Sequence, residues 1–393
     1  MRHYDFDKKI ERENSNSVKW SFIKEHTGVA DALPLWVADM DFETAPEITK
    51  KLIERAAHGI YGYTARTDGY YQELISWLSR RQGWKVRKEW ITHSNGVVNA
   101  IFNIIYALSN PGEGIVIQPP VYHPFARAVE KTGRKLLLNP LIRKEEHYEV
   151  DFEGFEHLLK TQGAKFFLLC SPHNPVGKVF TKEELETLGD LCIRYGVKVV
   201  SDEIHSDFIY KENEFHPFAA LSEAFEQNSI ICTAPSKTFN LAGLSTSNII
   251  IPNPELRYQF DSYSEARGLK SFNIFGAVAG ETAYRYGEPW LEELLAYLEK
   301  NKNLAVTYLK IHLPELKATN PEGTYFLWVD FNALKLSKEN LEKFLLEDAK
   351  LWLNQGYIFG REGEGFARIN LACRKETLKE ALFRLHQAIK KVV

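Results

Sequence analysis

The sequence contains no apolar run long enough to cross a membrane. Its longest such stretch, AIFNIIYAL at 100–108, is interrupted by Asn103 and is about half as long as a membrane-spanning helix, so it is typical of a buried helix. The first residues, MRHYDFDKKIEREN, are charged and lack the apolar core of a secretory signal. We therefore expect a soluble cytoplasmic protein without a membrane partner.

Cysteine is scarce, and neither sign of charge dominates. The four cysteines are widely scattered and form neither a CxxC metal pair nor a disulfide ladder, so we interpret them as reduced core thiols. The chain has 49 Lys and Arg against 52 Asp and Glu, a net charge of −3. This balance gives no electrostatic reason to expect nucleic acid as a partner.

Motifs for nucleotides and metals are also missing. PVGKVF has Val179 where a Walker loop needs Ser or Thr, and GREGEGFAR has Arg368 where the third glycine of a dinucleotide fingerprint would stand. Four histidines lie near predicted strand ends, but neither a helical H-x-x-x-H pair nor a thiolate accompanies them, so we predict no metal site. They are His93, His123, His173 and His205.

Short apolar runs alternate with helical patterns. Five runs of strand length are continuous rather than alternating, as in strands buried on both faces. The clearest helix, TKEELETLGDLCIRYG at 181–196, opens with a capping box of Thr181 and Glu184 and ends at Gly196. The pattern predicts an α/β fold with a mostly parallel sheet sandwiched by helices. The runs span 114–119, 164–172, 197–203, 229–235 and 248–252.

The length of 393 residues predicts a large domain and a smaller one. After about residue 290 the pattern changes to a long charged helix at 290–313, separate strands at 324–331 and 366–372, and a closing helix at 375–393. We therefore expect a small α+β domain at 289–393, a large domain at 46–288, and an N-terminal segment at 1–45 that packs with the small domain.

Three predicted strands lead to polar residues: Asn174, Asp202 and Lys237. In an open parallel sheet, ligands bind beyond the carboxyl ends of the strands. Each residue also has an ordinary interpretation, as a turn asparagine, a capping or ion-paired carboxylate and a solvated surface lysine. Together, an amine that forms a Schiff base, a carboxylate that keeps a pyridine nitrogen protonated and an amide that donates to a phenolic oxygen can hold pyridoxal 5'-phosphate.

The phosphate of such a cofactor needs hydrogen-bond donors. Residues 94–96, Ser-Asn-Gly, open an amphipathic helix, where free backbone N–H groups and the helix dipole favour an anion. Ser236 and Thr233, close to the lysine, could add hydroxyl donors. Tyr122 in QPPVYHPF could stack on the pyridine, although a lone tyrosine is more often a core or rim residue.

Six ordered motifs resemble the fold type I pyridoxal phosphate enzymes. Within them, the chain looks like the MalY/PatB branch of carbon–sulfur β-lyases, the cystathionine β-lyase-like proteins related to class I/II aminotransferases. The resemblance covers nearly the whole chain. The motifs are LPLWVADMDF (33–42), GIYGYT (59–64), SPHNPVGKVF (171–180), SDEIHSDF (201–208), PSKTFNLAGL (235–244) and RINLACR (368–374).

The resemblance implies a role for each matching residue. Lys237 matches the lysine that binds the cofactor covalently, Asp202 the partner of the pyridine nitrogen, Asn174 the donor to the ring oxygen and Tyr122 the stacking ring. The phosphate amides match Asn95, Gly96 and the neighbouring Val97.

The resemblance also implies a substrate clamp and a homodimer. Arg368 matches the arginine that binds the substrate α-carboxylate, for which a planar guanidinium offers two parallel hydrogen bonds, and we expect Asn174 and Tyr122 to contact the substrate as well. Tyr63 matches a tyrosine that reaches the active site of a second copy of the chain.

Two positions depart from the aminotransferase pattern. Ser245 stands where many aminotransferases of this fold have an arginine that binds the phosphate, and His205, which we count among the cofactor-binding residues, stands where they commonly have tyrosine. Both changes agree with the lyase branch, and they leave the cationic partner of the phosphate unidentified.

The resemblance implies α,β-elimination from an amino acid such as L-cystathionine or an S-substituted cysteine, giving a thiol, pyruvate and ammonia. Lys237 would remove the α-proton as a general base. An aminotransferase is the alternative, because it uses the same residues. A catalytically idle binding protein is a third possibility, against which the presence of Lys237, Asp202 and Arg368 together argues.

Overall fold

A seven-stranded sheet forms the centre of the computed structural model, which describes residues 4–391. Its strand order is β2-β10-β9-β8-β7-β3-β4. β10 is antiparallel to both of its neighbours, whereas β9, β8, β7, β3 and β4 are parallel, so the prediction of a mostly parallel sheet is confirmed. The strands are β2 (Ile91–Ser94), β3 (Gly114–Ile117), β4 (Lys135–Leu138), β7 (Ala164–Cys170), β8 (Lys198–Asp202), β9 (Ser229–Thr233) and β10 (Ser247–Ile250).

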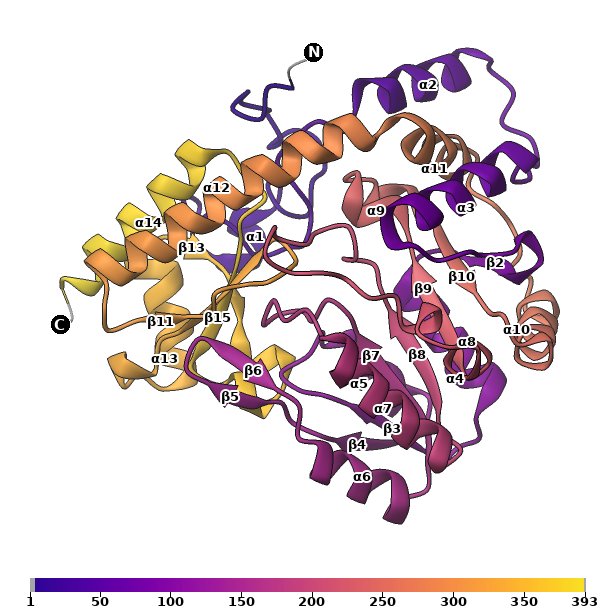
Figure 1. Ribbon diagram of the computed structural model, residues 1–393. Coiled ribbons are helices and arrows are strands. Elements are labelled where there is room, and N and C mark those ends of the chain that lie inside the picture. The colour runs from indigo at the N-terminus through magenta and orange to yellow at the C-terminus, as the bar shows by residue number, and fades with distance from the viewer. Residues whose placement is uncertain (1–3, 392–393) are drawn as a thin grey trace.

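Helices cover both faces of this sheet. Successive residues of each strand point to opposite faces, so they pack against different helices. Ile115 and Phe166 pack with helices of one face, and Val116 and Phe167 with helices of the other. Helices on both sides of the sheet bury both faces of its strands (Figure 1). This explains why the apolar runs in the sequence are continuous and do not alternate with polar residues. One face carries α4 (Val97–Leu108), α5 (Pro124–Lys131) and α10 (Pro254–Ala266); the other carries α3 (Asp68–Gln82), α6 (Phe152–Thr161), α7 (Lys182–Arg194) and α11 (Ile274–Tyr286).

The capping box predicted for the helix α7 is present. The Thr181 hydroxyl accepts a hydrogen bond from the Glu184 amide at 3.2 Å, and the Glu184 carboxylate accepts one from the Thr181 amide at 3.0 Å. Gly196 follows the helix with φ 68°, a left-handed conformation that glycine adopts without strain.

A four-stranded antiparallel sheet, ordered β11-β12-β15-β14, has its own hydrophobic core. The long helix α12 (Glu288–His312) joins the two cores, since Trp290 and Leu294 pack in the first and Ala305 and Leu309 in the second. In Figure 1 it runs from α11 toward α14. The elements here are β11 (Lys317–Ala318), β12 (Phe326–Asp330), β14 (Asn354–Gln355), β15 (Phe366–Asn370), α13 (Lys338–Lys343) and α14 (Lys375–Ile389).

The N-terminal segment lies against this smaller sheet. β1 (Leu33–Pro34) pairs in parallel with β13 (Leu351–Trp352). The domain boundaries at 45 and 288 stay predictions, and residues 1–3 and 392–393 of the predicted spans lie outside the described residues. The remaining α-helices and strands are α1 (Ile23–Thr27), α2 (Pro46–Ala57), α8 (Glu223–Gln227), α9 (Pro235–Thr238) and the hairpin of β5 (Ile142–Lys144) and β6 (His147–Glu149).

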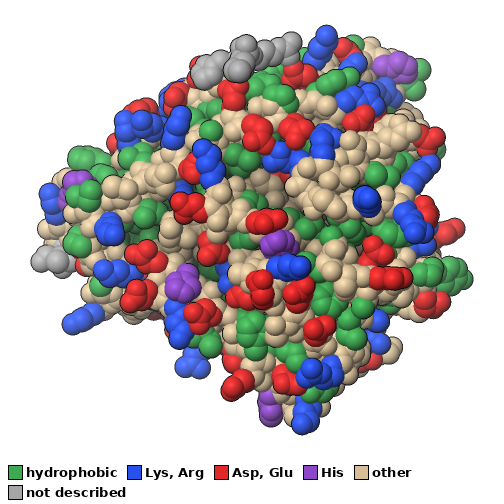
Figure 2. Space-filling view, in the orientation of Figure 1, with side chains coloured by type: hydrophobic (Ala, Val, Ile, Leu, Met, Phe, Trp, Pro, Cys, Tyr) green, Lys and Arg blue, Asp and Glu red, His purple; other side chains and the backbone are tan. Residues whose placement is uncertain are grey.

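The surface is mixed in charge. On the face shown in Figure 2, basic and acidic side chains are interspersed. Within residues 4–391, no helix is both long and apolar enough to cross a bilayer.

Candidate active site

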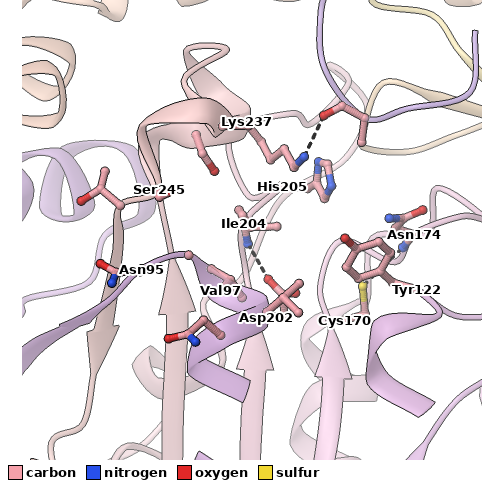
Figure 3. Close-up of a pocket in the computed structure, with 17 residues that line it drawn as sticks. Asn95, Val97, Tyr122, Cys170, Asn174, Asp202, Ile204, His205, Lys237 and Ser245 are labelled. Carbon is pink, nitrogen blue, oxygen red and sulfur yellow. Dashed lines mark hydrogen bonds between the residues drawn. The ribbon is translucent and has the colours of Figure 1, made fainter. Parts of the chain in front are cut away.

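A cavity of about 210 Å³ lies at the edge of the large sheet where the parallel strands end (Figure 3). Most of the residues predicted from the sequence line it, so the expected convergence of three strand ends occurs. These residues are Asn95, Gly96, Val97, Tyr122, Asn174, Asp202, His205, Ser236 and Lys237.

The strand directions explain this convergence. β8 ends on Asp202, β7 leads to Asn174, and β9 leads through Ala234 into α9, which carries Lys237. β10 runs the opposite way, so its beginning, not its end, reaches the same edge. Residues 245–246 therefore line the cavity too.

The Lys237 amine lies inside the cavity and donates a hydrogen bond of 2.7 Å to the Ala38 carbonyl. Burial, followed by the positive charge of Arg368, lowers the pKa of Lys237 to about 8, although Asp39 and Asp202 act in the opposite direction. The alternative interpretation of Lys237 as a solvated surface lysine is therefore wrong. A substantial neutral fraction at physiological pH makes it a good nucleophile and base.

Asp202 is a buried carboxyl group that forms no salt bridge within residues 4–391, although the charge of Lys237 acts on it. Its side chain is 5% exposed, and it accepts one hydrogen bond, from the Ile204 amide at 3.2 Å. Burial raises the pKa of Asp202 to about 7. Because a buried carboxylate is costly unless a cation or donors face it, this position suits a protonated ring nitrogen.

The beginning of α4 can hold an anion. Gly96 occupies the N-cap position with φ 101°, and no side chain of the described residues caps the helix there, so the first amides of α4 stay available. Asn95, Gly96 and Val97 all line the cavity. An uncapped helix N-terminus at a cavity wall fits a phosphate group.

Arg368 lies directly behind Asn174 and is 3% exposed. Its guanidinium donates hydrogen bonds of 2.8 Å to the Asn174 side-chain oxygen and to the Trp36 carbonyl, and it stacks over the Phe326 ring at 4.0 Å. Among the described residues, its Nε has no hydrogen-bond partner. Burial lowers the pKa of Arg368 to about 10, which leaves it charged at neutral pH.

His205 lines the cavity with its Nδ1 unpartnered within residues 4–391. Burial, Lys237 and Arg368 together hold the pKa of His205 well below its ordinary value, so the ring is neutral. In Figure 3 it lies beside the Lys237 amine.

Three predicted site residues do not line the cavity. Arg368 contacts the lining residue Asn174 from outside the lining, and the other two lie elsewhere. Thr233 is buried in β9 and does not line the cavity, and Tyr63 is fully exposed on the segment between α2 and α3. Their proposed roles stay predictions. For the four histidines, no cluster of three or more metal-ligating side chains occurs among the described residues.

Several lining residues were not predicted from the sequence. Ala38 acts through its carbonyl, so its side chain gave no signal, although it lies within the motif LPLWVADMDF. Cys170 has the pattern of a core thiol. Ser245 was noted as a departure from the aminotransferase pattern, which was the available signal. The unpredicted residues are Ala38, Val98, Asn99, Cys170, Ile204, Ala242, Ser245 and Thr246.

Comparison with known proteins shows similarity over the full length. The family model for aminotransferase class I and II matches residues 30–385. Cystathionine beta-lyase PatB of Bacillus subtilis is 46% identical, with 98% of this chain and 100% of the relative covered. Protein MalY of Escherichia coli is 33% identical, with 99% and 100% covered.

Solved structures agree in fold. A PLP-bound putative aminotransferase from Clostridium difficile is 46% identical with a TM-score of 0.96, covering 98% of this chain and 100% of that one. Cystalysin from Treponema denticola, which contains pyridoxal 5'-phosphate, is 38% identical with a TM-score of 0.97 and full coverage of both chains. The chain therefore belongs to the class I and II aminotransferase family, has the fold type I architecture and falls in the MalY/PatB branch.

Proposed function

We propose that this protein is a pyridoxal phosphate-dependent carbon–sulfur β-lyase that cleaves L-cystathionine or S-substituted cysteines to a thiol, pyruvate and ammonia. The observation that carries the proposal is the Lys237 amine inside a cavity that also contains Asp202. Among the curated relatives, similarity favours a lyase over an aminotransferase: cystathionine beta-lyase PatB is 46% identical and a cystathionine beta-lyase of Corynebacterium glutamicum 32%, whereas an aspartate aminotransferase of Pyrococcus horikoshii is 26% identical. The solved structure that is 46% identical is named only as a putative aminotransferase.

The cavity fits the cofactor at three points. Lys237 supplies the amine for covalent attachment, Asp202 can face the ring nitrogen, and the start of α4 can hold the phosphate. Tyr122 lines the same cavity, where its ring could stack on the pyridine. When bound, pyridoxal phosphate supplies a cationic ring that accepts the electron pair left by the departing α-proton.

Arg368 and Asn174 are proposed to hold the substrate. The guanidinium has five N–H donors, and its Nε is unpartnered among the described residues. A substrate carboxylate would accept hydrogen bonds from the Arg368 guanidinium, as the Asn174 side-chain oxygen and the Trp36 carbonyl do in this structure. Because Arg368 is packed over Phe326, the clamp is held in place before substrate binds.

Lys237 in its neutral form is proposed to take the α-proton of the substrate. The sulfur on the β-carbon then leaves with the bonding pair of the C–S bond and is protonated to a thiol. The remaining aminoacrylate hydrolyses to pyruvate and ammonia. Asp202 would lie against the ring nitrogen of the bound cofactor, where the ionised carboxylate would favour the protonated form of that nitrogen.

A homodimer is proposed because exposed apolar side chains gather around the segment that precedes α3. Ile53, Ile60, Tyr61 and Tyr63 are all exposed. Clustered exposed apolar side chains often mark an interface. In this arrangement Tyr63 would enter the cavity of the second copy.

The cytoplasm is the proposed location of the enzyme. All four cysteines are free and buried, as expected in a reducing compartment. They are Cys170, Cys192, Cys232 and Cys373.

The test is incubation of the purified holoenzyme with L-cystathionine in the absence of any keto acid. A lyase releases pyruvate and thiol in equal amounts, and Lys237→Ala abolishes both. The exposed Lys88, which pairs with Asp68 on the surface, gives the matched control Lys88→Ala, which should retain full activity. Conversion of the cofactor to its amine form without pyruvate would instead establish the aminotransferase alternative.

A further inference from the structure

One backbone carbonyl accepts two hydrogen bonds at the edge of the cavity. The Ala38 oxygen accepts from the Lys237 amine at 2.7 Å and from the Tyr325 hydroxyl at 3.2 Å. Lys237 comes from the large sheet, whereas Tyr325 directly precedes β12 of the smaller sheet. A phenol from the segment that leads into the smaller sheet therefore shares its hydrogen-bond acceptor with the proposed catalytic amine.

The Tyr325 ring is fixed by its surroundings. It is fully buried, with the ring of Phe208 edge-on at 4.9 Å and that of His205 edge-on at 5.4 Å. Burial, reinforced by Asp39, raises the pKa of Tyr325, so the hydroxyl stays protonated and acts as a donor. The phenol cannot turn away from the carbonyl without disturbing this packing.

The Ala38 carbonyl is held in place as well. The Asn370 side-chain amide donates hydrogen bonds of 2.7 Å to the carbonyls on either side, those of Val37 and Asp39. Asn370 is fully buried in β15. The Ala38 carbonyl, which accepts from both Lys237 and Tyr325, is thus held in position and does not move with the amine.

We propose that Tyr325 is a positioning residue for Lys237: its hydroxyl occupies one lone pair of the Ala38 carbonyl and so weakens the hold of that carbonyl on the charged amine. A carbonyl has two lone pairs, and a hydrogen bond from an ammonium group is stronger than one from a neutral amine. The phenol therefore favours the neutral amine, which is the form that attacks an aldehyde or takes a proton. This inference rests on the proposed role of Lys237.

The proposal is tested with Tyr325→Phe, which keeps the ring and leaves the Ala38 carbonyl bonded to Lys237. The matched control is Tyr210→Phe, because the buried Tyr210 hydroxyl has no hydrogen-bond partner in the described part of the chain. The full chain is stripped of cofactor, and its rate of capture of pyridoxal phosphate is followed by absorption from pH 6 to 10, a range chosen to span the pKa of about 8.

Tyr325→Phe is expected to move the midpoint of the rate profile upward by about half to one pH unit, which lowers the capture rate at neutral pH by about three- to tenfold. Tyr210→Phe should match wild type. An unchanged or lowered midpoint in Tyr325→Phe, with capture still dependent on Lys237, overturns this inference alone. Capture that survives in Lys237→Ala overturns the proposed function and this inference with it.

Discussion

Burial sets the chemistry of the two central residues. Lys237 and Asp202 are an ordinary base and acid in sequence, and water would keep both charged at neutral pH. Inside the cavity the charged form of each is disfavoured, so the pKa of the lysine falls to about 8 and that of the carboxyl rises to about 7. The cofactor-free chain therefore contains an amine that is partly neutral at neutral pH and a carboxyl group whose ionised form a cationic partner would stabilise.

The Asp202 carboxyl makes the cofactor-free chain less stable as pH rises. Its pKa is near 3.8 when unfolded and about 7 when folded, so the folded state binds the proton more tightly. The penalty is absent below about pH 4, grows between about pH 4 and 7, and is full above. A difference of about three pKa units corresponds to about 4 kcal/mol.

Asp202→Asn should remove this pH dependence, because an amide keeps the oxygen that accepts from the Ile204 amide and carries no charge. Denaturant unfolding of the cofactor-free proteins at pH 5 and pH 8, either side of the pKa near 7, measures it. At the higher pH the variant should be more stable than wild type, and its lyase activity in the loaded form should fall at least about a hundredfold. Asp68→Asn, at an exposed position, is the control. If the free energy of unfolding changed equally between pH 5 and pH 8 in wild type and Asp202→Asn, the raised pKa of Asp202 would be contradicted.

At the scale of elements, residues 36–39 form a strap at the edge of the cavity, which Ala38 lines. The carbonyl of Trp36 accepts from Arg368, that of Ala38 from Lys237, and those of Val37 and Asp39 from Asn370. The strap thus connects the proposed substrate clamp with the proposed catalytic amine through backbone atoms alone.

Asn370→Ala should loosen this strap. It leaves the carbonyls of Val37 and Asp39 without their donor and the Ala372 amide without its acceptor, at an expected cost of about 2–4 kcal/mol in the free energy of unfolding. Asn301→Ala is the matched control, because the equally buried Asn301 amide donates to the carbonyls of Leu371 and Cys373, away from the cavity. Denaturant unfolding should show similar losses for both variants. Only Asn370→Ala should raise KM, by at least about tenfold, and a similar KM change in both would show that the strap is not specifically involved.

The sequence predicted the elements better than their directions. The apolar runs, the capping box of α7 and the long helix α12 were all predicted, because each depends on a local pattern. The reversal of β10 was not, since a run such as NIIIP reads the same in either direction. Residues 245–246 therefore reach the cavity unexpectedly.

The strap escaped prediction for a different reason. Its contacts join residues about 200 to 330 positions apart and use main-chain carbonyls, as between Ala38 and Lys237 or Trp36 and Arg368. Every residue has a main-chain carbonyl, so the composition and spacing of a sequence do not indicate which carbonyls make such contacts. The polar side chains at the strand ends, in contrast, could be placed because strand direction brings them to one edge.

At the scale of the whole molecule, the residues of the proposed site come from segments of both sheets. Lys237 and Asp202 come from the large sheet, Arg368 and Tyr325 from the smaller one. Tyr63 makes no such contribution within one chain, since its side chain is fully exposed. A role for Tyr63 therefore requires a second copy of the chain, and this requirement can be tested separately from the chemistry.

Complementation between two inactive variants provides the test. Tyr63→Ala should fold normally, because the exposed side chain has little packing to lose, yet each of its sites would lack the residue that the partner supplies. Lys237→Ala removes the amine. In a mixed dimer, one site combines an intact Lys237 with an intact Tyr63 from the other copy, and the second site lacks both.

Equal mixing with free subunit exchange makes about half of the dimers mixed, so about a quarter of all sites should become active. Pyruvate release from L-cystathionine after mixing measures the recovery, and size-exclusion chromatography establishes that dimers form. If Tyr63 instead served its own chain, every site in the mixture would still lack one of the two residues. Mixing would then restore nothing, and the composite site between two copies would be excluded.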